Sequence, residues 1–143
     1  MGIVVLVGID GSDAGRRAVT FARDRAKALN GEVVLAHIIP WSPYSFTTPE
    51  ENEERPKRRA AELAAAEEQI MKPAMEIVGD EVKCTPICKH GDRVELLIQL
   101  AREHNVNHIL VGRTGESRLR NAFFGNVPAH LIQVADVPVT VVP

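Results

Sequence analysis

One stretch near the end of the chain combines glycines and arginines in a spacing that suits an anion. Gly112 is followed by two residues and Gly115, then by nine residues and the pair Gly125-Asn126. Glycine lets a backbone approach phosphate oxygens, and a helix beginning at Gly125 would add N–H groups and a positive dipole end. The intervening arginines are Arg113, Arg118 and Arg120. The stretch could bind a polyphosphate, but glycines after a strand are also ordinary turn residues, so both interpretations stay open at this point.

A second candidate segment, Asp10-Gly11-Ser12, directly follows the apolar run at residues 3–9. In a doubly wound parallel sheet, ligands bind beyond the carboxyl ends of the strands, where the strand order reverses. We therefore expect this turn and the stretch from Gly112 onward to meet at one edge. The glycines of the first turn do not have the G-x-G-x-x-G spacing of a dinucleotide site. A phosphoacceptor role for Asp10 is disfavoured, because the third strand ends in Cys88-Lys89-His90 rather than in an aspartate.

Alternating apolar runs and helical periodicities predict the elements that position these segments. Strands are expected at 3–9, 32–39, 82–88, 108–111 and 138–142, and helices at 14–29, 56–78, 92–104 and 125–135. Alternation of this kind requires right-handed crossovers and a parallel sheet. We predict one domain, residues 1–143, with a Rossmann-like doubly wound α/β fold, a five-stranded parallel sheet in the order 3-2-1-4-5, and helices on both faces.

Finer predictions concern helix faces and prolines. Residues 40–55 should form an exposed loop, with Pro56 in the first turn of the next helix. Pro73 should kink or end that helix, and Pro86 should place the third strand at a sheet edge. The first helix is expected to bury Ala18, Phe21, Ala22, Ala26 and Leu29.

Composition excludes several classes of function. A formal net charge of −2 argues against a nucleic-acid binder, and no apolar run reaches the length of a membrane-spanning helix. The N-terminal residues lack a basic region and a cleavage site, so we expect a strand there, no signal peptide, and a cytoplasmic protein. Cys84 and Cys88 lie too far apart along a strand for a disulfide, and His37, inside an apolar run, is expected to be a hydrogen-bonded core residue.

The pattern G-x2-G-x9-G followed by a small polar residue resembles the ATP-binding motif of the universal stress proteins. The resemblance extends over nearly the whole chain, including VVLVGIDGSDAGRRAV, LAHII and HGDRVELLIQLAREHNVNHILVGRTGES. One position departs from the family pattern: Asn126 stands where serine or threonine is usual. Asparagine can cap a helix and donate to phosphate, but it lacks the hydroxyl group.

The resemblance implies an adenine-nucleotide site, with ATP bound alone or with Mg²⁺. Asp10 with Gly11 and Ser12 would border adenine and ribose, Ile38 would help to form the adenine pocket, and Val111 and Gly112 would contact the nucleoside. The phosphates would be held by Gly115, Gly125, Asn126 and Val127, with Arg113 nearby. The resemblance also implies a homodimer through the last strand, 138–142, and a regulatory role in the stress response. Alternatives are a nucleotide-independent protein-interaction module and a weak ATPase, although no catalytic constellation is visible.

Overall fold

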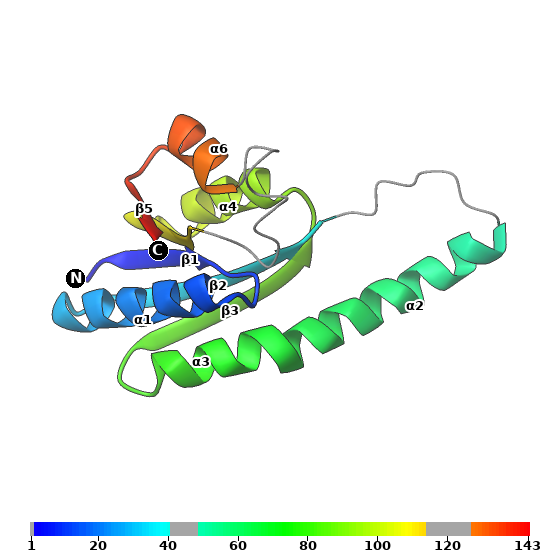
Figure 1. Ribbon diagram of the computed structural model, residues 1–143, viewed down its shortest axis with the longest axis horizontal. Helices are drawn as coiled ribbons and strands as arrows, with labels where there is room; N and C mark the ends of the chain where they lie inside the picture. The colour runs from blue at the N-terminus through cyan, green and yellow to red at the C-terminus, as the bar shows by residue number, and fades with distance from the viewer. Residues whose placement is uncertain (1, 41–48, 114–126) are drawn as a thin grey trace.

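The computed structural model describes residues 2–40, 49–113 and 127–143 and places five parallel strands in one sheet. The strands are β1 (Val4–Gly8), β2 (Glu32–Ile39), β3 (Lys83–His90), β4 (His108–Gly112) and β5 (Val139–Val142). Their order is β3-β2-β1-β4-β5, with the reversal between β1 and β4 (Figure 1). The predicted α/β fold and strand order are therefore confirmed.

Helices cover both faces of this sheet (Figure 1). α1 (Asp13–Ala28) and α3 (Lys72–Val78) pack on one face, where Val5 and Val7 of β1 point. α4 (Arg93–Glu103) and α6 (Val127–Val134) pack on the other face, around Leu6. Because successive side chains of a strand point to opposite faces, β1 and β2 must be apolar at nearly every position, as their sequences are.

α1 presents a stripe of small residues to the sheet. Ala18, Ala22 and Ala26 are fully buried. Phe21 and Leu29, predicted to share this buried face, are 46% and 45% exposed, so that prediction was wrong. The alanines let the helix lie close to the strands, and larger side chains at the margin of the stripe consequently remain in solvent.

The second helical region begins earlier than predicted. α2 spans Pro49–Ala66, so part of the expected loop is helical and Pro56 lies inside the helix rather than in its first turn. Pro56 is exposed, and water can therefore hydrate the carbonyl group that its missing N–H leaves unbonded. α2 extends well beyond the sheet in Figure 1.

Pro73 does not end this helical region. The chain continues through a π-helical turn, η1 (Glu67–Met71), directly into α3. π-Helical turns are a usual distortion within α-helices, and here the turn ends at Met71, two residues before the proline. Gly79, with φ of 75°, follows α3 as its C-cap.

β3 occupies an edge of the sheet and carries an exposed Pro86, as predicted. Cys84 and Cys88 of this strand are unpaired, half-buried thiols, and burial raises the pKa of both. A raised pKa lowers the thiolate fraction and hence the nucleophilicity. Within the described ranges, no helix is both long and apolar enough to cross a membrane.

Candidate functional site

The turn between β1 and α1 is held by two side chains of the predicted site. Asp10 Oδ1 accepts a hydrogen bond from Ser12 N at 3.0 Å, and Ser12 Oγ accepts one from Gly15 N at 3.1 Å. The second bond makes Ser12 the N-cap of α1. Gly11 lies between them with φ of 84°, a conformation that favours glycine. These bonds hold the carboxylate of Asp10 at the carboxyl edge of the sheet.

Gly112, at the end of β4, lies against the beginning of α1. A Cβ atom at this position would be 2.7 Å from both the carbonyl carbon of Ala14 and the nitrogen of Gly15. Only glycine permits this approach without a backbone shift. The structure thus places Gly112, the first glycine of the predicted motif, at the beginning of the helix that follows Asp10–Ser12.

Ile38 and Val111 lie on the opposite sheet face from α1. Each is 3% exposed and belongs to the core cluster that includes Leu97 and Leu131. Their side chains are therefore almost fully covered by protein. They can shape the floor of a pocket at this edge, but they present little surface of their own.

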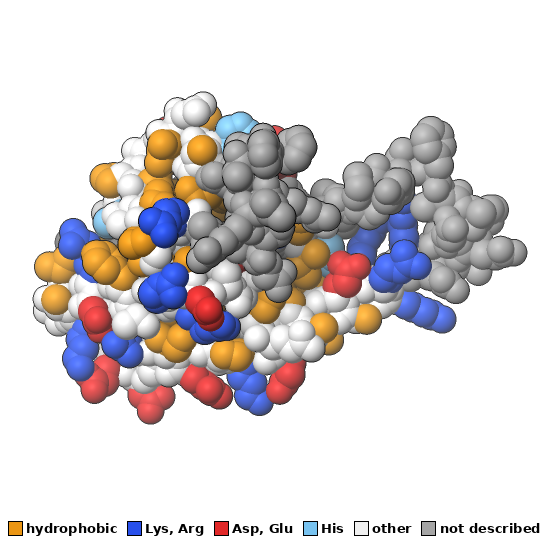
Figure 2. Space-filling view, in the orientation of Figure 1, with side chains coloured by type: hydrophobic (Ala, Val, Ile, Leu, Met, Phe, Trp, Pro, Cys, Tyr) orange, Lys and Arg blue, Asp and Glu red, His pale blue; other side chains and the backbone are white. Residues whose placement is uncertain are grey.

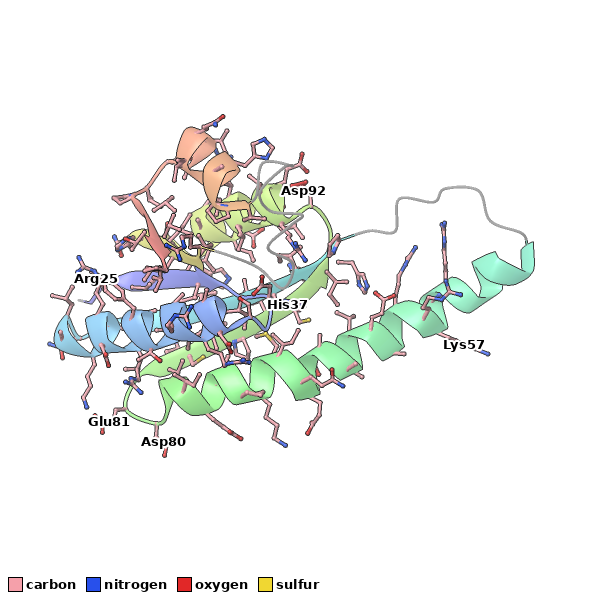
Figure 3. The ribbon with its side chains drawn as sticks, in the orientation of Figure 1. Arg25, His37, Lys57, Asp80, Glu81 and Asp92 are labelled. Atoms are coloured by element: carbon pink, nitrogen blue, oxygen red, sulfur yellow. The ribbon has the colours of Figure 1, made fainter. Side chains whose placement is uncertain are left out.

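His37 connects β2 to the same turn. Its Nδ1 lies 2.7 Å from the carbonyl oxygen of Ile9, the residue before Asp10, and the side chain is buried. Since a carbonyl oxygen can only accept, Nδ1 carries the hydrogen. Figure 3 shows His37 on β2 beside the turn that leads into α1. The predicted core role is confirmed, but the link to the turn had no signal in the sequence.

Two arginines of the described residues, Arg113 and Arg16, lie near this edge, and sequence reasoning singled out only Arg113. Arg113 is exposed, and its backbone nitrogen donates to the carbonyl oxygen of Val142 at 2.6 Å. Arg16 donates to the carbonyl oxygen of Gly11 at 3.0 Å and pairs with Asp13. The hydrogen bond and charge of Arg16 lower the pKa of Asp13. The signal that could have found Arg16 is its place in the first turns of the helix that follows Asp10.

Part of the predicted phosphate site lies outside the described residues. This applies to Gly115, Gly125 and Asn126, and to Arg118 and Arg120. Val127 is the first residue of α6. Among the residues that the structure does describe, no three His, Cys, Asp or Glu side chains form a group that could hold a metal ion.

Comparison with known proteins shows which family the chain belongs to. Residues 4–143 match the model of the universal stress protein family. A universal stress protein of Mycobacterium tuberculosis is 25% identical over 153 residues, an alignment that covers 97% of this chain and 47% of the relative. The chain therefore spans about half the length of the curated relatives it matches.

Solved structures of the same family have the same fold. The universal stress protein UspA from Lactobacillus plantarum is similar with a TM-score of 0.83 at 20% identity, covering 99% of this chain and 97% of that one. A universal stress protein solved in complex with cAMP is similar with a TM-score of 0.69 at 25% identity, with coverage of 99% and 97%.

Proposed function

Because the chain belongs to the universal stress protein family, we propose that it binds an adenine nucleotide, specifically ATP, at the carboxyl edge of β1 and β4. The observation that carries the proposal is the contact between Gly112 and the N-terminal turn of α1. This contact joins the Asp10 turn to the first glycine of the G-x2-G-x9-G pattern. A similar protein has been solved with cAMP, which also contains adenine.

The charges divide the proposed site into two halves. A carboxylate repels phosphate but accepts hydrogen bonds from hydroxyl groups, so Asp10 faces the ribose. Gly11 and Ser12 line the same side, and Ile38 and Val111 lie beneath the adenine. Arg113 and the glycines of the motif, with Asn126 and Val127 at the start of the last helix, hold the phosphates. Guanidinium groups and helix N-termini are the usual protein partners of phosphate oxygens.

The described residues of the proposed site include groups that can bind a nucleotide but only one carboxylate that can bind Mg²⁺. A Cβ at Gly112 would lie 2.7 Å from the nitrogen of Gly15, so the backbones of β4 and α1 are close together at this edge. Asp10 is the acidic residue of the described part of the proposed site. Mg²⁺ bound through one carboxylate and the phosphates themselves would keep most of its water ligands.

We further propose that the protein acts as a cytoplasmic, nucleotide-dependent module of the stress response and forms a homodimer through β5. β5 is an edge strand of the sheet, and all four of its residues are only half-buried. An edge strand of this apolar composition tends to pair with another strand. Pairing with the β5 strand of a second copy would cover it.

Calorimetric titration with ATP tests the proposed site. We expect binding by the native protein and a loss of about threefold to tenfold in affinity for Arg113→Gln, which removes a charge but keeps the backbone bond to Val142. Arg25→Gln is the matched control, because Arg25 is also exposed but lies at the opposite end of α1 (Figure 3).

Two results would contradict the proposal. One is the absence of heat at millimolar ATP, which would favour the nucleotide-independent interaction module. The other is an equal loss for both arginine variants, which would indicate a general charge effect. Replacing Gly115 and Gly125 with leucine then decides whether the glycines act in binding or only as turn residues.

A further inference from the structure

A groove separates α4 from α6 on the face of the sheet opposite α1. It has a volume of about 690 Å³, and its apolar lining comes from Val94 and Ile98 of α4 and Val134 of α6. Val134 is 50% exposed, so the groove presents apolar surface to solvent. Figure 2 shows hydrophobic side chains over this upper part of the molecule. None of the described residues of the proposed nucleotide site lines the groove.

A second hollow of about 310 Å³ lies beside the groove along α4. Ile98 and Arg102 line both spaces, and Val106 and Val137 belong to the second. The lining residues of the two hollows, together named the channel, run from Asp92, before α4, to Asn105, after it, and these 13 steps at 1.5 Å per residue span about 20 Å. A helix of about four turns has the same length.

The rim of this channel is acidic. Asp92, Glu95 and Glu103 line the groove, and Asp136 lines the second hollow. Among the described residues, Arg102 is the one lysine or arginine of the two linings, and it is paired with Asp136 at 2.8 Å. Four carboxylates and one guanidinium leave a local charge of −3, although the whole chain has a net charge of only −2. The local field therefore favours a cationic occupant.

We propose that this channel binds an amphipathic helix of a partner protein, with one apolar stripe flanked by lysine or arginine. The apolar stripe lies on Val94, Ile98 and Val134, and the basic flanks face Glu95 and Glu103. Recognition of this kind uses a groove between helices and anchor residues at spacings of three and four. Two copies of this chain would bring like charges together at the rim, so the acidic lining disfavours a second copy as the occupant.

Fluorescence anisotropy with a labelled synthetic peptide tests the proposal on the full chain. The peptide has about 14 residues, with leucines at helical spacing and lysines on both flanks. We expect binding that weakens as the salt concentration rises through about 0.15 M, because the rim charges are exposed. A peptide of the same design with glutamate in place of lysine should bind at least tenfold more weakly.

Matched variants locate the binding. Val134→Asp should weaken the lysine peptide by about tenfold, whereas Ile132→Asp should not. Both residues are exposed aliphatic side chains of α6, at 50% and 61%, but only Val134 lines the groove. Glu103→Lys should also weaken binding, and Glu76→Lys, an exposed change on α3, should leave it unchanged.

Three outcomes would overturn the proposal: equal binding of the lysine and glutamate peptides, equal effects of the two α6 variants, or no binding of the lysine peptide. Sedimentation of Val134→Asp provides a separate check. If this variant alone converts a dimer into a monomer, a second copy covers the groove and the proposal is wrong. Calorimetry with ATP should be unaffected by Val134→Asp, so failure here is distinguishable from failure of the nucleotide site.

Discussion

Replacing Gly112 with alanine adds one carbon atom where β4 meets α1. The new Cβ would lie 2.7 Å from the carbonyl carbon of Ala14 and from the nitrogen of Gly15, and 3.0 Å from the Cβ of Ala14. The two nearest atoms belong to the backbone, so no flexible side chain can yield. Either β4 or the first turn of α1 must move. Overpacking of a close contact costs about 1–3 kcal/mol, and we expect about 2–3 kcal/mol because backbone has to shift.

Unfolding in urea measures this cost. Gly112→Ala should lower the midpoint without changing the slope, because the surface exposed on unfolding stays the same. In a domain near 150 residues, each kcal/mol corresponds to about 2–4 °C, so the melting temperature should fall by roughly 4–12 °C.

Gly8→Ala is the matched control, also at the end of a strand. A Cβ at position 8 would lie 3.1 Å from Leu97 Cδ1 and 3.2 Å from Val111 Cγ1, which are ends of side chains that can give way. We expect a smaller loss than at Gly112. Native stability for Gly112→Ala, or a larger loss for Gly8→Ala, would refute the packing argument.

Three further predictions concern the turn and the sheet. Ser12→Ala removes the cap of α1 and should lower the free energy of unfolding by about 1 kcal/mol in the same urea titration; an unchanged midpoint would show that the cap is dispensable. His37→Leu should cost about 1–3 kcal/mol, because the buried carbonyl oxygen of Ile9 loses its donor, and a negligible loss would mean that another donor replaces it. Burial, with the charge of Arg25, lowers the pKa of His108 below 6.5, so the folded state resists protonation. The stability that this lowered pKa of His108 contributes is present above pH 6.5 and is lost as the pH falls through the folded-state pKa. The free energy of unfolding of His108→Gln should therefore fall less with decreasing pH than that of the native protein. Equal declines for the two proteins would show that His108 does not cause the pH dependence.

The fold could be predicted where burial of an element produces a recognisable run of apolar residues in the sequence. β1 and β2 are covered on both faces, so their sequences are nearly unbroken apolar runs. Phe21 was misplaced because helical periodicity marks a broad face, whereas the contact of α1 with the sheet is narrow and made by alanines. Pro56 was placed wrongly because its solvent exposure inside α2 is not revealed by local sequence. Of the two outcomes predicted for Pro73, the end of the helix was wrong, because the chain continues through a π-helical turn into α3.

The candidate site was predictable at the level of topology. Asp10 follows β1 and Gly112 ends β4, and adjacent parallel strands end at the same edge of a sheet. The distances were not predictable: the approach of Gly112 to Gly15 and the bond from His37 to Ile9 depend on how α1 and β2 pack. The local composition also indicated the glycines and arginines after Gly112. It did not indicate Arg16, whose hydrogen bond to Gly11 depends on how α1 lies beside the turn at Asp10–Ser12.

The most direct test of a nucleotide site at this edge is a pair of backbone amide NMR spectra recorded without and with ATP. We expect the largest shift changes at the amides of residues 10–12 and 111–113, with little change at Asn105 and Val106 at the opposite end of the sheet. Shifts confined to that opposite end, or spectra that stay identical at millimolar ATP, would contradict it.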